Sequence, residues 1–203
     1  MSDSSICRLK LSDAEQKLEA EGGELILLTG DVGSGKSVWL KRLAGVIANP
    51  ETIHISMNES KPEIRMLFDR WPCLWLGQTI EEELMFGLKE HVSTAQLADT
   101  LLAWGLGDLG LCSEPQALNR WQSICLAFAA MTLAKPDLIL LDNPSAALSE
   151  DMAMNLSSDI ANWLQQSNTI VVVASNRWHD WHSVATQRWN VSAPGTLPEL
   201  INN

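Results

Sequence analysis

Tyrosine is absent from the 203-residue sequence, phenylalanine occurs only three times, and the first 29 residues contain no Phe, Trp or Tyr. The chain also lacks an uninterrupted apolar run of the roughly 18 residues that a membrane-spanning helix requires. The opening residues, MSDSSICRLKLSD, contain no long apolar stretch and therefore do not predict a secretory signal peptide. We expect a cytoplasmic protein, which would reach the inner face of the cell membrane only through a partner.

Basic residues are also few, because 14 Lys and Arg stand against 25 Asp and Glu, a formal net charge of −11. Nucleic-acid affinity comes mostly from Lys and Arg that contact phosphates, so we expect no nucleic-acid partner. The four cysteines show no C-x-x-C spacing. This pattern argues against a zinc site or a disulfide framework and indicates free thiols in a reducing compartment.

The apolar fraction of 46% is sufficient for a sizeable core, and the length suits one domain or a domain with a small insertion. Short apolar segments alternate with helical patterns at 36–47 and 149–166, which predicts a parallel sheet covered on both faces. The expected strands are 24–30, 52–56, 63–68, 137–142 and 169–175.

The pattern between residues 79 and 135 is helical throughout, which predicts a helical subdomain inserted between two expected strands. We therefore expect one α/β domain. Residues 1–68 and 135–203 would form its core, and residues 69–134 would form the helical subdomain.

Residues 30–37, GDVGSGKS, match the phosphate-binding pattern G-x-x-x-x-G-K-[ST] in full, between a predicted strand and a predicted helix. The glycines let the backbone wrap a phosphate, and the helix start adds its positive dipole end. A chance glycine turn is the alternative, against which the Lys-Ser pair argues. The expected nucleotide-binding residues are Gly30, Asp31, Val32, Gly33, Ser34, Gly35, Lys36, Ser37 and Asp142.

Within this set, Lys36 is expected to reach the terminal phosphates and the Ser37 hydroxyl to contact Mg²⁺. Asp142 ends the apolar segment 137–142, where an aspartate can hold the hydration shell of the metal. Nucleotide binding is therefore the first functional prediction.

Further segments resemble those of ABC-type ATPases. Residues 64–88 are similar to the family's glutamine-loop segment, and their tail TIEEELMFGL is similar to the form in importer and energy-coupling-factor ATPases. Residues 117–148 resemble the signature helix followed by the second nucleotide motif and the D-loop. Residues 169–176, TIVVVASN, resemble the strand and switch that close the site. The resemblance covers Glu24 to about Asn176.

This resemblance implies a P-loop NTPase fold of the RecA type, with an inserted helical subdomain and a reduced N-terminal antiparallel β subdomain. It implies ATP and Mg²⁺ as ligands. It also implies a dimer with another ABC ATPase domain, identical or different, and a membrane permease subunit as partner.

Several residues depart from the family pattern. Asn143 stands where the family has its catalytic glutamate, and Ser175 stands where it has the switch histidine. A carboxamide can orient a water but cannot take its proton, and general-base assistance is worth roughly 10²- to 10⁴-fold in rate. Alignment through the F-G-L tail puts Asp69 at the glutamine position, so the expected metal ligands are Ser37, Asp69 and Asp142. An alternative register assigns Gln78 instead, but it breaks the spacing to TIEEELMFGL.

The signature segment, L-S-G-G-Q in the family, consists here of Leu118, Asn119, Arg120, Trp121 and Gln122. In the family it acts in trans, on ATP held by the partner. Asn119 can still cap the helix, and Arg120 can offer a charged contact to phosphate. Trp121 cannot replace glycine, because its side chain blocks close backbone approach. We expect this surface to have lost its original role. The D-loop residues are Ala146, Ala147, Leu148 and Ser149.

The pattern therefore predicts a nucleotide-binding protein that hydrolyses ATP slowly or not at all, as a non-canonical subunit or regulator of an ABC assembly. One alternative is a working transporter ATPase whose base is Asp69 or Glu150. Another is an interaction module with a relic P-loop, which agrees with the missing aromatic that would stack on adenine. His179, Asp180 and His182 could suggest a metal site, but a solvated helix start is the favoured interpretation.

Overall fold

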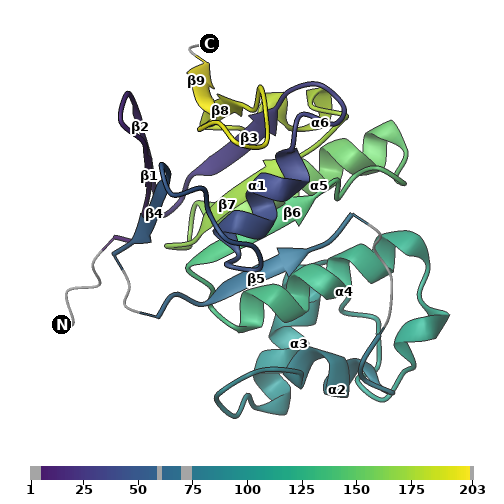
Figure 1. The fold of residues 1–203 in the computed structure, drawn as a ribbon. Coiled ribbons are helices and arrows are strands. Elements are labelled where there is room, and N and C mark those ends of the chain that lie inside the picture. The colour runs from purple at the N-terminus through teal and green to yellow at the C-terminus, as the bar shows by residue number, and fades with distance from the viewer. Residues whose placement is uncertain (1–5, 59–60, 70–74, 202–203) are drawn as a thin grey trace. The chain divides into compact units, whose positions relative to one another are not determined.

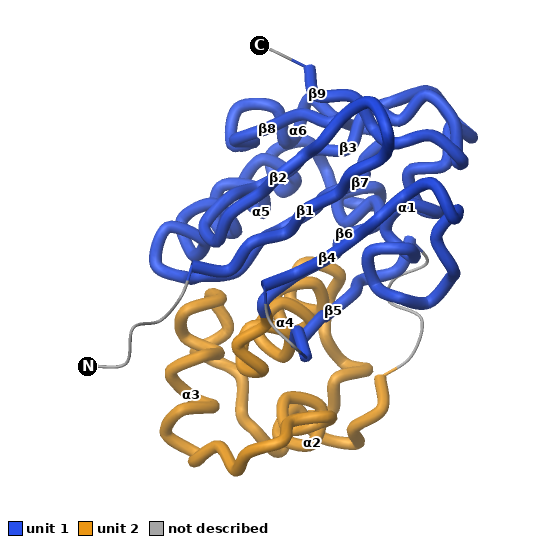
Figure 2. Tube along the Cα trace, turned by 60° about the vertical axis from the view of Figure 1, so that its left-hand side comes forward, with its two compact units in different colours: residues 1–69, 137–203 blue, residues 70–136 orange. Residues whose placement is uncertain are grey.

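The structure is a computed structural model that describes residues 6–58, 61–69 and 75–201. The chain divides into two compact units, one formed by Met1–Asp69 with Asp137–Asn203 and the other by Arg70–Pro136 (Figure 2). The expected division lay one or two residues earlier at each junction, at 68/69 and 134/135. Of the segment 64–88 that resembles the family's glutamine loop, residues 70–74 lie outside the described residues.

The first unit contains a six-stranded sheet in the order β5-β6-β7-β3-β8-β9 (Figure 1). The first five strands of this order pair in parallel, and β9 pairs antiparallel with β8. The strands are β3 (Leu25–Thr29), β5 (Ile64–Leu67), β6 (Leu138–Asp142), β7 (Ile170–Ala174), β8 (Gln187–Asn190) and β9 (Glu199–Ile201). β3, β6 and β7 are buried along their whole length, as expected for strands covered on both faces.

Helix α1 (Lys36–Leu43) lies across the front of this sheet in Figure 1. It buries Trp39, Leu40 and Leu43 in one core with alternate residues of the central strands, such as Ile26 and Leu28 of β3. The helix is shorter than the predicted 36–47, because the chain turns at Gly45, whose φ is +69°. The same unit contains α5 (Glu150–Leu164) and α6 (His179–His182).

A separate three-stranded antiparallel sheet, in the order β2-β1-β4, completes the first unit. It consists of β1 (Arg8–Ser12), β2 (Lys17–Glu21) and β4 (His54–Met57). The alternating sequences RLKLS and KLEAE bury Leu9, Leu11, Leu18 and Ala20 in the core shared with α1. The resemblance predicts an antiparallel N-terminal subdomain, but β1 and β2 were not among the expected strands, although their period-two pattern was the available signal.

The second unit is helical and contains α2 (Ile80–Met85), α3 (Thr94–Ala103), a 3₁₀ turn η1 (Pro115–Ala117) and α4 (Arg120–Leu133). Thr79 and Ser93 cap α2 and α3 with their side-chain oxygens. Trp104 stacks on Phe128 of α4 with ring centroids 5.2 Å apart. Among the described residues, no helix is long and apolar enough to cross a membrane.

Candidate nucleotide site

The P-loop connects the buried end of β3 to the first turn of α1. Gly33 has φ +84°, and a side chain added there would meet no atom within 4 Å, so the loop is open at this residue. Gly35 has φ +104°, and a Cβ there would lie 2.8 Å from the Cα of Pro194. Both positions therefore require glycine for conformation, and Gly35 requires it for space as well.

Lys36 lies folded back on the loop that precedes it. Its side chain is buried, and its Nζ donates to the carbonyl oxygens of Gly30 at 2.8 Å and Asp31 at 3.0 Å. Burial lowers the pKa of Lys36, against the opposite effect of the Asp31 and Asp142 carboxylates. A buried cation whose hydrogen bonds go to neutral carbonyls can exchange these contacts for an anionic oxygen. The geometry therefore suits a phosphate in the loop.

A second feature of the loop points the same way. The hydroxyl oxygen of Ser34 is buried and has no hydrogen-bond partner among the described residues. Buried polar atoms are nearly always satisfied in proteins, so an orphaned hydroxyl in a glycine loop indicates a missing partner. The residues present therefore fit a bound polyphosphate.

Ser37 and Asp142 form the adjoining part of the site. The Ser37 hydroxyl donates to Oδ1 of Asp142 at 2.9 Å, and Asp142 is only 3% exposed. Burial raises the pKa of Asp142 and Asp69 raises it further, whereas the Ser37 hydrogen bond and the charges of Lys41 and Lys36 lower it. Carboxylate and hydroxyl oxygens are ligands that suit Mg²⁺, and a divalent cation would relieve the repulsion between the two carboxylates.

This arrangement predicts that Asp142→Asn stabilises the protein in the absence of ligand. The raised pKa means that the fold disfavours the ionised carboxyl, so the variant should melt at a higher temperature than wild type at neutral pH. The difference should shrink as pH falls toward 3.8, the ordinary aspartate pKa, because the wild-type carboxyl then becomes neutral too. Thermal unfolding from pH 7 to pH 4 measures it. Exposed Asp108→Asn is the control and should show no such gain.

The parallel register brings three site positions to the same level. Leu67 of β5 pairs with Leu141 of β6, and Asp142 pairs with Ala174 of β7. The residues that follow these strands therefore meet at one edge of the sheet. Nδ2 of Asn143 donates to Oδ1 of Asp69 at 2.9 Å, and Oδ1 of Asn143 accepts from the backbone N–H of Asn176 at 2.9 Å. Asp69, which the register through the F-G-L tail selected, thus contacts the residue after Asp142.

Ser175 lies at the same edge, but its hydroxyl is directed to its own turn. The residue is 4% exposed, and its Oγ accepts from the backbone N–H of Arg177 at 3.1 Å. Glu150, the other candidate base, is exposed in the first turn of α5, where a carboxylate suits the helix dipole.

The residues of the signature segment lie in the second unit, as does Gln78. Asn119 caps α4 through a hydrogen bond to the N–H of Gln122, and the Gln122 side chain returns one to the N–H of Asn119. The capping role expected for Asn119 is therefore present. Trp121 is half-buried and Arg120 exposed. The backbone N–H of Gln78 donates to Glu82 at the start of α2.

A polar cluster that was not predicted from the sequence joins Ser145 and the D-loop residue Leu148 to Arg177 and the following helix α6. Arg177 donates to the carbonyls of Ser145 and Leu148 at 3.3 and 2.7 Å, and pairs with both carboxylate oxygens of Asp180 at 3.2 and 3.1 Å. Ser145 Oγ donates to Asp180 at 2.7 Å, and Trp181 Nε1 donates to Ser145 Oγ at 3.3 Å. The available signal was an arginine three residues before an aspartate, a spacing at which side chains meet on a helix.

This cluster also accounts for the residues that had suggested a metal. Asp180 is buried, where its carboxylate pairs with Arg177 and accepts a hydrogen bond from Ser145. Across the part of the chain that the structure describes, no group of three or more His, Cys, Asp or Glu could hold a metal ion.

A family profile described as ABC transporter matches residues 14–146, which is more than half of the chain. The chain belongs to the ABC transporter family. This confirms the resemblance drawn from the glutamine-loop, signature-helix and D-loop segments.

Individual relatives agree with this assignment. An ABC transporter ATP-binding protein of Methanosarcina mazei is 27% identical over 173 residues, which cover 78% of this chain and 34% of that protein. The energy-coupling factor transporter ATP-binding protein EcfA2 of Clostridium tetani is 23% identical over 188 residues, which cover 84% of this chain and 65% of that protein. The chain thus spans about a third of the first relative and just under two thirds of the second.

The solved structures confirm the predicted fold class. CbiO1 from Clostridium perfringens, described as part of the ABC transporter complex cbiONQ, superposes with a TM-score of 0.80 at 14% identity, covering 96% of this chain and 88% of that one. The α/β P-loop NTPase fold is therefore shared, although most side chains differ.

Proposed function

We propose that this chain is the ATP-binding subunit of a transporter and that it binds Mg-ATP but hydrolyses it slowly or not at all. One observation carries the proposal. The side chains expected to contact phosphate and metal, Lys36, Ser37 and Asp142, are all present in the site. The carboxamide of the next residue, Asn143, is hydrogen-bonded to Asp69 and to the backbone N–H of Asn176.

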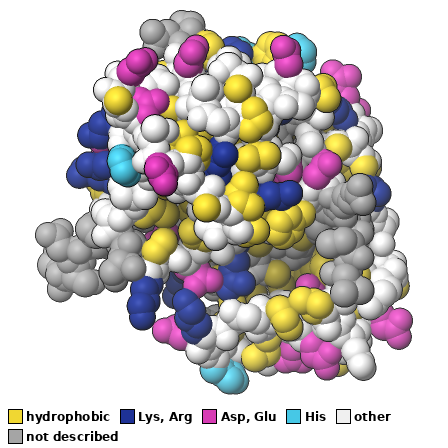
Figure 3. Space-filling model, viewed as in Figure 1, with side chains coloured by type: hydrophobic (Ala, Val, Ile, Leu, Met, Phe, Trp, Pro, Cys, Tyr) yellow, Lys and Arg dark blue, Asp and Glu magenta, His cyan; other side chains and the backbone are white. Residues whose placement is uncertain are grey.

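Binding would use the residues of the P-loop. Lys36 and the N–H groups at the start of α1 would contact the phosphates, and the Ser34 hydroxyl would gain the partner it lacks. Ser37, Asp142 and Asp69 would hold Mg²⁺, which neutralises phosphate charge. On the face drawn in Figure 3, basic side chains stand singly or in small groups among acidic and hydrophobic ones. Because the chain carries a formal net charge of −11, a phosphate ligand would be held by specific contacts in the P-loop and not by a general positive surface.

Hydrolysis would need a group that accepts a proton from the attacking water. Asn143 cannot do this, because a carboxamide is not basic. Ser175 is not basic either, and its hydroxyl already accepts from Arg177. Without a base, turnover should be lower by roughly 10²- to 10⁴-fold than in an enzyme that has one.

The comparisons support a proposal about partners. The relatives are named as ATP-binding proteins of transporters, and the structural neighbour belongs to a transporter complex. We therefore propose a membrane permease and a second ABC ATPase domain, identical or different, as partners at the inner face of the membrane. ATP would favour the closed dimer, which would persist without a fast base.

Calorimetric titration with Mg-ATP and a phosphate-release assay on the same preparation test this function. We expect binding heat together with turnover near the uncatalysed background. Absence of heat would instead support a relic P-loop in an interaction module. Rapid phosphate release by the purified chain would contradict the proposal of slow hydrolysis.

A second candidate is a working ATPase, favoured by the Asp69 carboxylate that lies 2.9 Å from Nδ2 of Asn143. In this case Asp69 or Glu150 would act as base. Turnover should then be measurable in wild type and should disappear in either Asp69→Asn or Glu150→Gln. Unchanged rates in both variants would exclude these bases.

A further inference from the structure

We propose that Asn143 is a positioning residue that holds the Asp69 carboxylate at the metal end of the nucleotide site. This inference rests on the proposed binding of Mg-ATP. It assigns fixed places to an amide and an acid: the carboxamide belongs at position 143, and the carboxylate belongs at position 69.

The hydrogen bonds of Asn143 require a carboxamide. Its Nδ2 donates to Asp69 and its Oδ1 accepts from the N–H of Asn176. An ionised Asp or Glu could accept from Asn176 but could not donate to Asp69. Two carboxylates at these positions would repel each other. The residue type at 143 is therefore matched to the acid at 69.

The backbone fixes Asn143 as firmly as its side chain does. Its N–H donates to the carbonyl of Ala174 at 2.8 Å, and its φ is +49°. Among residues with a side chain, Asn adopts this left-handed conformation readily. Three hydrogen bonds thus hold Asn143 between the ends of β5 and β7, with its Nδ2 directed at Asp69.

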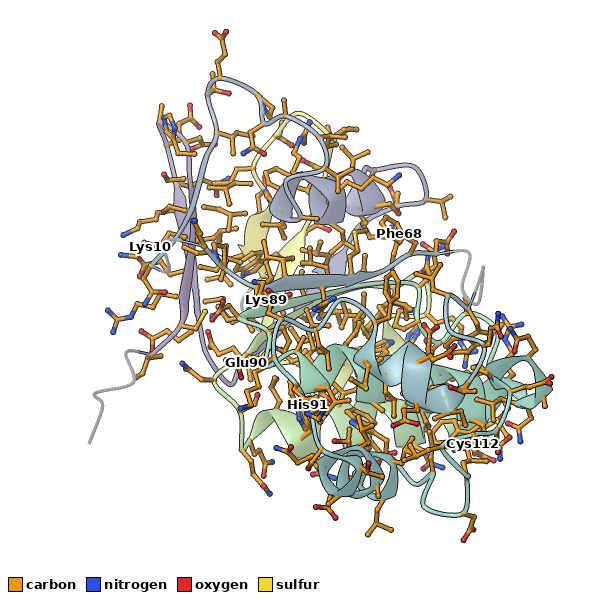
Figure 4. The ribbon with its side chains drawn as sticks, turned by 90° about the horizontal axis from the view of Figure 1, so that it is seen from below. Lys10, Phe68, Lys89, Glu90, His91 and Cys112 are labelled. Atoms are coloured by element: carbon orange, nitrogen blue, oxygen red, sulfur yellow. The ribbon has the colours of Figure 1, made fainter. Side chains whose placement is uncertain are left out.

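Asp69 lies at the same edge of the sheet as Asp142, because Leu67 pairs with Leu141 and the residues after both strands meet there. It follows Phe68, which Figure 4 labels at the end of β5. Asn143 directly follows Asp142 and donates to Asp69 at 2.9 Å, so the two carboxylates lie near each other. Mutual repulsion would move the more exposed Asp69 away. The Nδ2 of Asn143 opposes this movement and keeps a second anionic oxygen available beside the Ser37–Asp142 pair.

The inference predicts how strongly Mg²⁺ tightens ATP binding, measured as the ratio of the ATP dissociation constants in EDTA and in Mg²⁺. Asp69→Asn should reduce this ratio roughly tenfold to 100-fold, because a charged contact to the metal is lost. Asn143→Gly should reduce it by about tenfold, as expected for loss of a residue that orients a metal ligand. Glycine adopts φ +49° without strain, so this variant removes the side chain alone.

The exchanged double variant, Asp69→Asn with Asn143→Asp, separates position from hydrogen bonding. It can restore the acid–amide hydrogen bond and should therefore recover melting temperature relative to Asn143→Asp alone, in which two carboxylates would repel each other. It should not recover the Mg²⁺ ratio, because the carboxylate has moved. Asn176→Ala is the matched control, since only its backbone N–H takes part, and it should match wild type.

Each variant is titrated with ATP in EDTA and with ATP in Mg²⁺. Its melting temperature is measured separately by thermal unfolding of the ligand-free chain. An unchanged Mg²⁺ ratio in Asn143→Gly, or full recovery of the ratio in the exchanged variant, would overturn the positioning role. Failure of the proposed function gives a different result, because wild type would then bind ATP under neither condition.

Discussion

Replacing Lys36 with alanine is expected to weaken Mg-ATP binding by at least about 30-fold, corresponding to 2 kcal/mol or more, the effect of truncating one partner of a buried charge pair. Among the described residues, the buried ammonium donates to the carbonyls of Gly30 and Asp31, at 2.8 and 3.0 Å. These neutral partners leave the cation free to contact phosphate oxygens. Isothermal titration with Mg-ATP measures the loss.

Lys41→Ala is the matched control for this variant. Lys41 lies on the same helix and is only half-buried. It contributes to the potential at Asp142 without sharing the loop contacts of Lys36. Its removal should therefore change affinity only slightly. If Lys36→Ala binds Mg-ATP as tightly as wild type, Lys36 does not contact the phosphates.

Replacing Asp180 with alanine is expected to lower the free energy of unfolding by roughly 3 kcal/mol, because a charge-assisted hydrogen bond to the buried Ser145 hydroxyl and the ion pair with the half-buried Arg177 are lost together. At about 2–4 °C per kcal/mol for a chain of this size, the melting temperature should fall by about 6–12 °C. The reason is that Arg177 and the Ser145 hydroxyl would lose their carboxylate partner. The nine tryptophans provide a fluorescence signal for the thermal transition.

Two further variants calibrate this result. Ser145→Ala removes one hydroxyl and leaves the Arg177–Asp180 pair, so it should destabilise less, by about 1–2 kcal/mol. Ser183→Ala, at an exposed position just beyond α6, should leave the melting temperature unchanged. If Asp180→Ala melts at the same temperature as wild type, the contacts of Asp180 with Ser145 and Arg177 do not stabilise the protein in solution.

Local sequence patterns predicted much of the chain correctly. The apolar runs that became β3, β6 and β7 are wholly buried strands, and the GDVGSGKS turn connects β3 to α1. These elements are encoded locally, because a buried parallel strand needs a continuous apolar run and a phosphate loop needs glycines at fixed places. The resemblance predicted an N-terminal antiparallel subdomain, but the strands β1 and β2 were not assigned from the residues, since they are short and only half apolar.

The side-chain contacts within the site could not be predicted as well from the sequence. Asp69 and Asn143 are 74 residues apart, and their hydrogen bond exists because β5 and β6 pair in register. Resemblance alone suggested Asp69, with Gln78 as the alternative. Nothing in the local sequence indicated that Asn143 would bind both Asp69 and Asn176, or that Asp180 would be buried against Arg177 and Ser145.

The sequence by itself determined the P-loop α/β fold, the glycine loop that we propose binds phosphate, and the amide at position 143. Only the tertiary structure decided what that amide does. Strand pairing places the ends of β5, β6 and β7 at one edge of the sheet, and hydrogen bonds between residues so distant in the chain follow from that register.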